Sequence, residues 1–163
     1  MLTNKVDLLH IVHDHHIVHR HIKPENVVLG LPGTKSANLL HLTDFRSADL
    51  YRKAKTLQHI PQRSDRTSRI YTLRFSSLDS DLNKTQSRRS DLQSLGYVLI
   101  YFLRGDMPWP ADSSKRRIKE IKQTTTPAEL CKGFPGIIFA QYRVDSAFDI
   151  YHRSILPLHV ICL

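Results

Sequence analysis

The most informative stretch of this chain reads His19-Arg20-His21-Ile22-Lys23-Pro24-Glu25-Asn26-Val27-Val28-Leu29. Its first eight residues are mostly polar or basic and include a proline, which is typical of a loop. Its last three residues are apolar, which favours a short strand. A second apolar run covers residues 39–42, after a connection that contains Gly30, Pro32 and Gly33. The pattern therefore predicts a basic loop that leads into a small β-hairpin.

Two segments carry helical patterns. In residues 4–14 apolar side chains recur at helical spacing, which predicts a helix. Residues 92–103 are apolar on almost all sides, as in a helix that is surrounded by protein. Ser90 and Gln93 have the spacing of a capping box, so we expect this helix to begin at Ser90. We also expect Trp109 to pack just beyond its end.

Composition indicates one ordinary soluble domain, or a piece of one. The chain has 163 residues, of which 40% are hydrophobic and 24% are charged. The longest strongly apolar run is too short to span a bilayer, and the first residues contain no signal-peptide core, so we expect no membrane span and a cytoplasmic or nuclear location. Two cysteines, Cys131 and Cys162, are too few for a disulfide framework, and we expect both to be reduced.

The formal net charge of +9 predicts affinity for anionic partners. No zinc-finger spacing or aromatic RNA-binding pattern accompanies the basic residues, so the sequence indicates no specific nucleic-acid binding. The densest cluster contains residues 115–117 with Lys119 and Lys122. We interpret this cluster as the solvated face of a helix.

A histidine-rich segment overlaps the loop and comprises His10, His13, His15, His16, His19 and His21. One interpretation is a zinc or copper site, for which His15 and His19 have a suitable spacing on one helical face. The other is a set of solvated or packed histidines. We favour the second because no thiolate is near in the sequence and Asp14 is the only carboxylate within the segment.

The loop quoted above resembles the catalytic loop of protein kinases. In that family a His-Arg-Asp triplet supplies the catalytic aspartate, and an asparagine five positions later holds magnesium. Here His19 and Arg20 begin the triplet, but His21 stands at the aspartate position. Asn26 has the expected spacing, and Lys23 matches the lysine of kinases directed at serine and threonine. The resemblance implies catalytic positions at His21 and Lys23, a magnesium ligand at Asn26, and structural support from His19 and Arg20.

A second kinase motif follows the hairpin as Asp44-Phe45-Arg46, where the family has Asp-Phe-Gly. The resemblance implies that Asp44 binds magnesium together with Asn26, but only when ATP is bound. The glycine is replaced by Arg46, which removes a residue able to adopt conformations closed to others. Its guanidinium can pair with the carboxylate and stand in for cationic charge. This replacement argues against a normally mobile activation segment.

Further stretches look like the casein kinase I family. They are, in order, Gln-His-Ile-Pro at residues 58–61, Gln-Ser-Arg-Arg-Ser-Asp-Leu-Gln-Ser-Leu-Gly-Tyr-Val-Leu at 86–99, Met-Pro-Trp at 107–109 and Leu-Cys-Lys-Gly-Phe-Pro at 130–135. In that family the carboxylate at the position of Asp91 accepts backbone hydrogen bonds from the catalytic loop. We therefore expect Asp91 to support the loop, although simple helix capping would also explain an aspartate there.

The resemblance implies a mainly α fold, namely a protein-kinase-like C-lobe with a small β-hairpin at the catalytic loop. Because the sequence contains no glycine-rich phosphate loop, we expect the kinase N-lobe to be absent. We expect a C-lobe-like region over residues 1–137 and a divergent C-terminal tail over residues 138–163.

Two functions remain open. The first is a noncatalytic, pseudokinase-like domain that binds other proteins, with acidic or phosphorylated partners favoured by the positive charge. The second is an ATP-dependent Ser/Thr kinase whose N-lobe lies outside this sequence. The family uses ATP and Mg²⁺, which we expect this chain alone not to bind. We favour the first because His21 replaces the catalytic aspartate.

Overall fold

A computed structural model describes residues 4–64 and 72–134, with side chains from residue 8 onward. Its helices are α1 Asn4–Asp14, α2 Leu78–Asp81, α3 Arg88–Arg104, α4 Lys115–Thr124 and α5 Pro127–Leu130, with 3-10 turns η1 Pro24–Asn26 and η2 Phe45–Ser47. Its strands are β1 Ile17–Val18, β2 Val27–Leu29, β3 Leu40–Leu42 and β4 Asp49–Leu50. The predicted first helix and the predicted hairpin are confirmed. The predicted tail over residues 138–163, with Cys162, lies outside the described residues.

Two short antiparallel ladders flank the basic loop. β2 pairs with β3, with Val27 opposite Leu42 and Leu29 opposite Leu40. β1 pairs with β4, which places Ile17 opposite Leu50. The second ladder was not predicted, because two-residue strands leave no alternating pattern in a sequence. The loop of residues 19–26 begins at the end of β1 and ends at the start of β2, so both of its ends are fixed.

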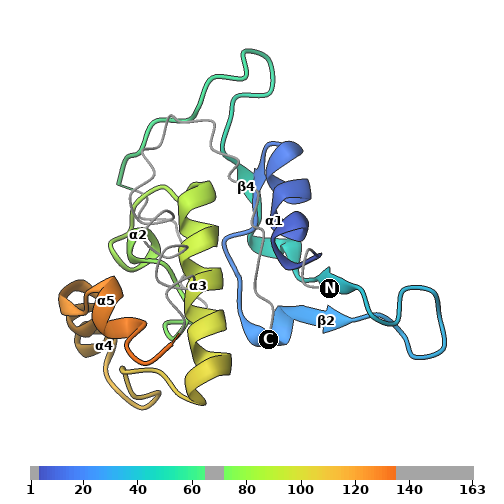
Figure 1. Ribbon diagram of the computed structural model, residues 1–163. Coiled ribbons are helices and arrows are strands. Elements are labelled where there is room, and N and C mark those ends of the chain that lie inside the picture. Colours follow the sequence, from blue (N-terminus) through green and yellow to red (C-terminus); the bar gives the residue numbers. More distant parts are fainter. Residues whose placement is uncertain (1–3, 65–71, 135–163) are drawn as a thin grey trace.

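Helix α3 lies at the centre of the molecule (Figure 1). In this view α1 and β4 lie on one side of it and α2, α4 and α5 on the other. Tyr97, Val98 and Ile100 are at most 1% exposed, and Trp109 packs edge-on against Tyr97 with ring centroids 5.0 Å apart. The predicted burial of this helix and the predicted position of Trp109 are confirmed. Near the end of α3 Phe102 is 60% exposed, so the helix is not covered on every side.

The start of α3 differs from the prediction by one turn. The N-cap is Ser87, and Ser90 is the third helical residue, whose Oγ accepts a hydrogen bond from Ser87 N at 3.2 Å. Gln93 is not part of the cap; its side-chain oxygen instead accepts a hydrogen bond from the backbone N–H of Leu78. The prediction failed because two serines three residues apart both satisfy the capping pattern. The helix ends at Gly105, whose φ of 77° lies in the left-handed region that glycine favours.

Lys122 is buried, so the interpretation of the whole basic cluster as a solvated face was wrong at this residue. Its side chain is 0% exposed, and its Nζ contacts Asp81 Oδ2 at 2.9 Å. The same Nζ donates to the carbonyl oxygens of Leu73 and Ser76 at 2.6 and 2.7 Å. Burial lowers the pKa of Lys122, and the Asp81 carboxylate opposes that shift. This ion pair therefore joins α4 to α2 and to the segment before it.

Replacement of Ile100 by alanine should lower the free energy of unfolding by about 2 to 5 kcal/mol, because it opens a cavity beside α3. Phe102→Ala on the same helix is the matched control and should cost less than about 1 kcal/mol, since its ring is mostly exposed. Chemical denaturation of both variants measures the difference. Equal costs would contradict the placement of α3.

Replacement of Lys122 by alanine should cost about 3 to 5 kcal/mol, because the buried carboxylate of Asp81 loses its cation. The double change Lys122→Met with Asp81→Leu should cost less than Lys122→Ala, since no uncompensated charge remains. Lys115→Ala, at an exposed position of the same helix, is the control. Thermal or chemical unfolding separates these cases, and a double variant less stable than Lys122→Ala would refute the argument.

Candidate functional site

The Asp91 carboxylate fixes the start of the basic loop. Asp91 is 1% exposed and lies in the first turn of α3. The backbone N–H of His19 donates to Oδ2 at 2.7 Å, and that of Arg20 donates to Oδ1 at 2.8 Å. His13 Nε2, from α1, lies 3.0 Å from Oδ2. One carboxylate thus joins α1, the loop and α3.

His19 connects the loop to the segment around Asp44. Its ring is fully buried, and its Nδ1 accepts the backbone N–H of His21 at 3.2 Å. The other ring nitrogen, Nε2, then carries the hydrogen and donates to the carbonyl oxygen of Thr43 at 2.9 Å. The ring of Phe45 packs edge-on against His19, with centroids 4.7 Å apart. The residue before Asp44 and the residue after it are therefore both held by His19.

Arg20 holds the chain that follows Asp44. Its Nε donates to the carbonyl oxygen of Ser47 at 2.6 Å, and its guanidinium contacts Asp49 Oδ2 at 3.0 Å. Arg20 itself has a φ of 65°, in the left-handed region. The side chain thereby fixes η2 and the first residue of β4 relative to the loop.

His21 lies between two partners from distant segments. Its Nδ1 is 3.1 Å from Asp44 Oδ2, and its Nε2 is 3.3 Å from the hydroxyl of Thr72. Burial lowers the pKa of His21, and the positive charge of Lys23 lowers it further, so the ring is neutral at pH 7. Because a carboxylate only accepts, Nδ1 carries the hydrogen, and Nε2 then accepts from Thr72. The ring therefore holds Asp44 and leaves a lone pair facing a hydroxyl.

Asn26 and Lys23 differ in how they are held. Asn26 is buried, and its Nδ2 donates to the carbonyl oxygen of His21 at 2.9 Å. Its own carbonyl oxygen accepts the backbone N–H of Thr43 at 2.9 Å. Lys23 is half-buried; its backbone carbonyl oxygen accepts the N–H of Asn26 at 3.1 Å, but its side chain makes no hydrogen bond or ion pair with the other described residues. The structure thus brings Asn26 to His21, which in turn contacts Asp44, whereas the Lys23 side chain is not held by such contacts.

Asp44 is held on both carboxylate oxygens. Arg46 Nε donates to Oδ1 at 2.7 Å and a second guanidinium nitrogen donates to Oδ2 at 3.0 Å. His21 reaches Oδ2 from the other side. The hydrogen bond from Arg46 is the main cause that holds the pKa of Asp44 well below its usual range. The carboxylate is therefore ionised, and its charge is already matched by a guanidinium.

This arrangement does not fit a magnesium ion. Mg²⁺ takes oxygen ligands in octahedral geometry and is usually bound through one or two carboxylates plus substrate phosphates. Both oxygens of Asp44 accept hydrogen bonds, and the Arg46 charge at Oδ1 repels a second cation. The side chain of Asn26 directs its Nδ2 donor toward His21. That Asn26 and Asp44 hold magnesium when ATP is bound stays a prediction.

Two contacts of the site were not predicted. Thr72 lies 51 residues after His21, and no spacing in the sequence links the two. The contact of His13 with Asp91 was not predicted either, because 78 residues separate the two in the sequence. The sequence contained a usable signal only for the burial of Lys122, which lies away from the site. Lys122 follows the buried Ile118 by four residues, so the two share one face of α4.

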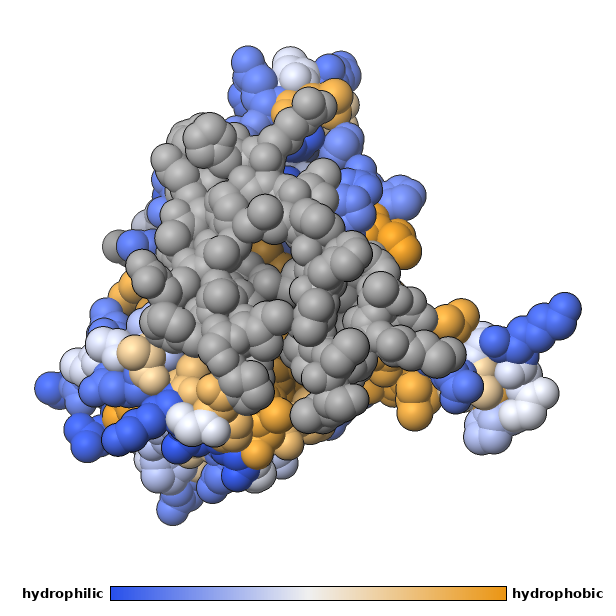
Figure 2. Space-filling view, viewed as in Figure 1, coloured by the Kyte–Doolittle hydropathy of each residue, from blue (hydrophilic) through white to orange (hydrophobic). Residues whose placement is uncertain are grey.

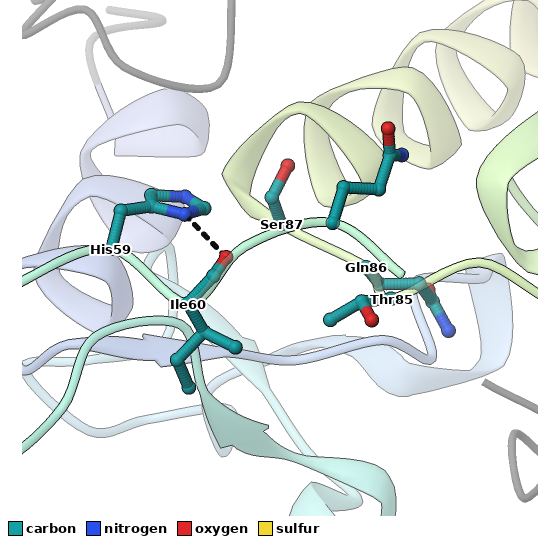
Figure 3. A pocket seen from close by; sticks show the side chains of 6 residues that line it. His59, Ile60, Thr85, Gln86 and Ser87 are labelled. Carbon is teal, nitrogen blue, oxygen red and sulfur yellow. Dashed lines mark hydrogen bonds between the residues drawn. The ribbon is translucent and has the colours of Figure 1, made fainter. Parts of the chain in front are cut away.

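The histidine-rich segment and the surface hollow give less support for a functional site. In the described part of the chain, no three His, Cys, Asp or Glu side chains gather as a metal site would need, and His13 and His19 are packed in the core. A shallow hollow lies before α3, where His59 Nδ1 donates to the carbonyl oxygen of its neighbour Ile60 at 2.7 Å (Figure 3). Its lining includes none of the predicted site residues.

Among residues 4–64 and 72–134, no helix has the length and apolar character to cross a bilayer.

Comparison with known proteins adds the family. Residues 2–146 match the protein kinase domain. Casein kinase I homolog 2 of Schizosaccharomyces pombe is 45% identical over 131 residues, which is 77% of this chain and 30% of that protein. Casein kinase I homolog 1 of the same organism is 41% identical over 85% of this chain and 32% of its own length. Casein kinase I homolog 1 of Saccharomyces cerevisiae is 40% identical over 84% of this chain and 26% of its own.

The chain thus spans about a third or less of the length of the curated relatives it matches. Within that span the kinase match covers the loop of residues 19–26, Asp44 and α3, which are the elements that build the site. The five helices and two small antiparallel sheets of the described residues fit a kinase-like fold. The chain belongs to the casein kinase I family of protein kinases.

Proposed function

We propose that this chain is a casein kinase I-like domain that does not transfer phosphate and that acts by binding other proteins. The observation that carries the proposal is His21, which stands at the position of the catalytic aspartate. Its neutral ring is hydrogen-bonded to Asp44, which is the carboxylate expected to hold magnesium. A neutral imidazole supplies no negative charge, and phosphoryl transfer depends on positioned charge and metal.

We further propose that residues 1–137 correspond to a kinase C-lobe and that residues 138–163 form a diverging tail. The kinase match over residues 2–146 and the central position of α3 support the first part. In this proposal His21 and Lys23 occupy the catalytic positions, and His19, Arg20 and Asp91 are structural supports. A cytoplasmic or nuclear location is the corresponding proposal for where the protein acts.

A second candidate function is ATP-dependent Ser/Thr phosphorylation by a longer protein that contains this domain. One observation favours it, because His21 Nε2 accepts from the Thr72 hydroxyl. A lone pair at residue 21 thus already faces a hydroxyl, and histidine is the commonest general base in enzymes. Lys23 and Asn26 also remain at the positions that the family uses.

A chimera with a casein kinase I N-lobe ahead of residue 1 separates the two candidates. We expect the chimera with His21 and Arg46 unchanged to phosphorylate casein at least about 100-fold more slowly than the chimera with His21→Asp and Arg46→Gly, because a positioned acid or base contributes about 10² to 10⁴ in rate. Either change alone should restore far less than both. The readout is incorporation of labelled phosphate into casein.

Asp44→Ala in the same chimera is the control for the chemistry, and it should remove whatever activity the double variant gains. If the unmodified chimera is as active as the double variant, and Asp44→Ala abolishes that activity, the proposal that the domain does not transfer phosphate is wrong and the second candidate function is correct.

We propose that the protein partners are acidic or phosphorylated and bind the exposed basic residues at the start of α4. Lys115, Arg116 and Arg117 are all exposed. Figure 2 shows hydrophilic side chains gathered over the region of α4 and α5, at the lower left of the view. Arg116 pairs with Glu120 at 2.9 Å, which leaves a net positive charge on this turn. Such a surface attracts anionic peptides through charge instead of shape.

Binding of an acidic or phosphoserine-containing peptide should weaken at least about tenfold between low salt and about 0.3 M salt, since exposed charges are screened. Charge reversal at residues 115–117 should weaken binding at low salt by a similar factor. Reversal of the exposed Lys53 and Lys55, on another loop, is the matched control and should have little effect. Fluorescence anisotropy measures all three. Binding that ignores salt, or that survives reversal at residues 115–117, would show that this surface is only solvated.

A further inference from the structure

The Arg46 guanidinium occupies the outer side of the Asp44 carboxylate. Its two contacts, at 2.7 and 3.0 Å, reach different oxygens of the same carboxylate, which is the two-pronged geometry that arginine alone can supply. The Arg46 side chain is 88% exposed, whereas that of Asp44 is 16% exposed. The guanidinium therefore lies between the carboxylate and the solvent from which an ion would arrive.

The backbone explains why this contact forms between residues so close in sequence. Asp44 has a φ of 65° and is followed by the single 3-10 turn η2. The turn closes with a hydrogen bond from Ala48 N to Phe45 O at 3.0 Å. In this turn the Arg46 side chain can fold back on Asp44, while the ring of Phe45 packs against His19. The inner side of the carboxylate is held by His21, so Asp44 is enclosed by donors on two sides.

To bind Asp44, a divalent cation would have to displace at least one of the donors, Arg46 or His21, that contact its carboxylate. Mg²⁺ loses its water reluctantly and needs an open carboxylate oxygen, and a guanidinium at contact distance repels it. The Arg46 side chain is 88% exposed, so its replacement should disturb the core little. The competition is therefore local and can be tested by changing one side chain.

We propose that Arg46 is a built-in cation that keeps divalent metal ions off Asp44, and that its removal alone converts Asp44 into a divalent-cation site. The inference concerns cation binding in the absence of nucleotide. It is independent of whether His21 supports phosphate transfer, so failure of one proposal leaves the other standing.

The test is titration of the full 163-residue chain with Mn²⁺, read by paramagnetic broadening of backbone amide signals in NMR spectra. In Arg46→Ala, the amides of residues 43–47 should broaden at a Mn²⁺ concentration at least tenfold lower than in the unchanged chain. Arg46→Gln is a second variant that keeps the size of the side chain and should behave in the same way. Arg46→Lys, which keeps the charge but loses the two-pronged contact, should lie between the two.

Two controls fix the location of the effect. Arg116→Ala removes an exposed arginine with a comparable 2.9 Å contact to a carboxylate, and it should leave broadening near Asp44 unchanged. Adding Asp44→Asn to Arg46→Ala should abolish the gain. Equal broadening in the unchanged chain and in both Arg46 variants overturns the proposal, and so does a gain that survives Asp44→Asn. Absence of broadening near Asp44 in both variants overturns it as well.

Discussion

The buried carboxylate of Asp91 is the interaction on which the site depends. It accepts the backbone N–H groups of two consecutive residues, His19 and Arg20, at 2.7 and 2.8 Å. Hydrogen bonds to a charged acceptor are stronger than neutral ones, and either N–H group would pay a desolvation cost if it were left buried without a partner. The loop of residues 19–26 has little regular structure of its own. Its shape therefore comes from this anchor and from the two short ladders at its ends.

These supports use atoms that do not depend on the side chain at residue 21. Asp91 binds backbone N–H groups, His19 accepts the N–H of His21, and Asn26 donates to the His21 carbonyl oxygen. A carboxylate can be exchanged for an imidazole at residue 21 without loss of any of these bonds. This explains how the loop keeps a kinase-like frame while the group that it presents has changed.

The sequence was sufficient to predict elements whose pattern extends over several consecutive residues. The helices over residues 4–14 and 92–103 and the hairpin were predictable from apolar spacing, and the family from ordered motifs. The position of the α3 cap was not, because Ser87 and Ser90 fit the same pattern and only backbone geometry distinguishes them. Lys122 was misassigned because charge runs are usually solvated, and burial of its Nζ requires the Asp81 carboxylate, which comes from another element. The contact of His21 with Thr72 joins distant segments and leaves no local signal.

The two departures from the kinase motifs compensate each other. Asp44 keeps one negative charge, Arg46 balances it, and the neutral ring of His21 donates to the remaining side. Return of a carboxylate to residue 21 would place a second negative group close to Asp44, and two like charges at such a separation oppose each other's ionisation. Loss of Arg46 alone would leave the charge of Asp44 without its guanidinium partner, with a neutral imidazole where the family has a carboxylate. In the present arrangement both oxygens of Asp44 accept hydrogen bonds, from Arg46 and from His21, so either reversal alone removes a donor that Asp44 already uses.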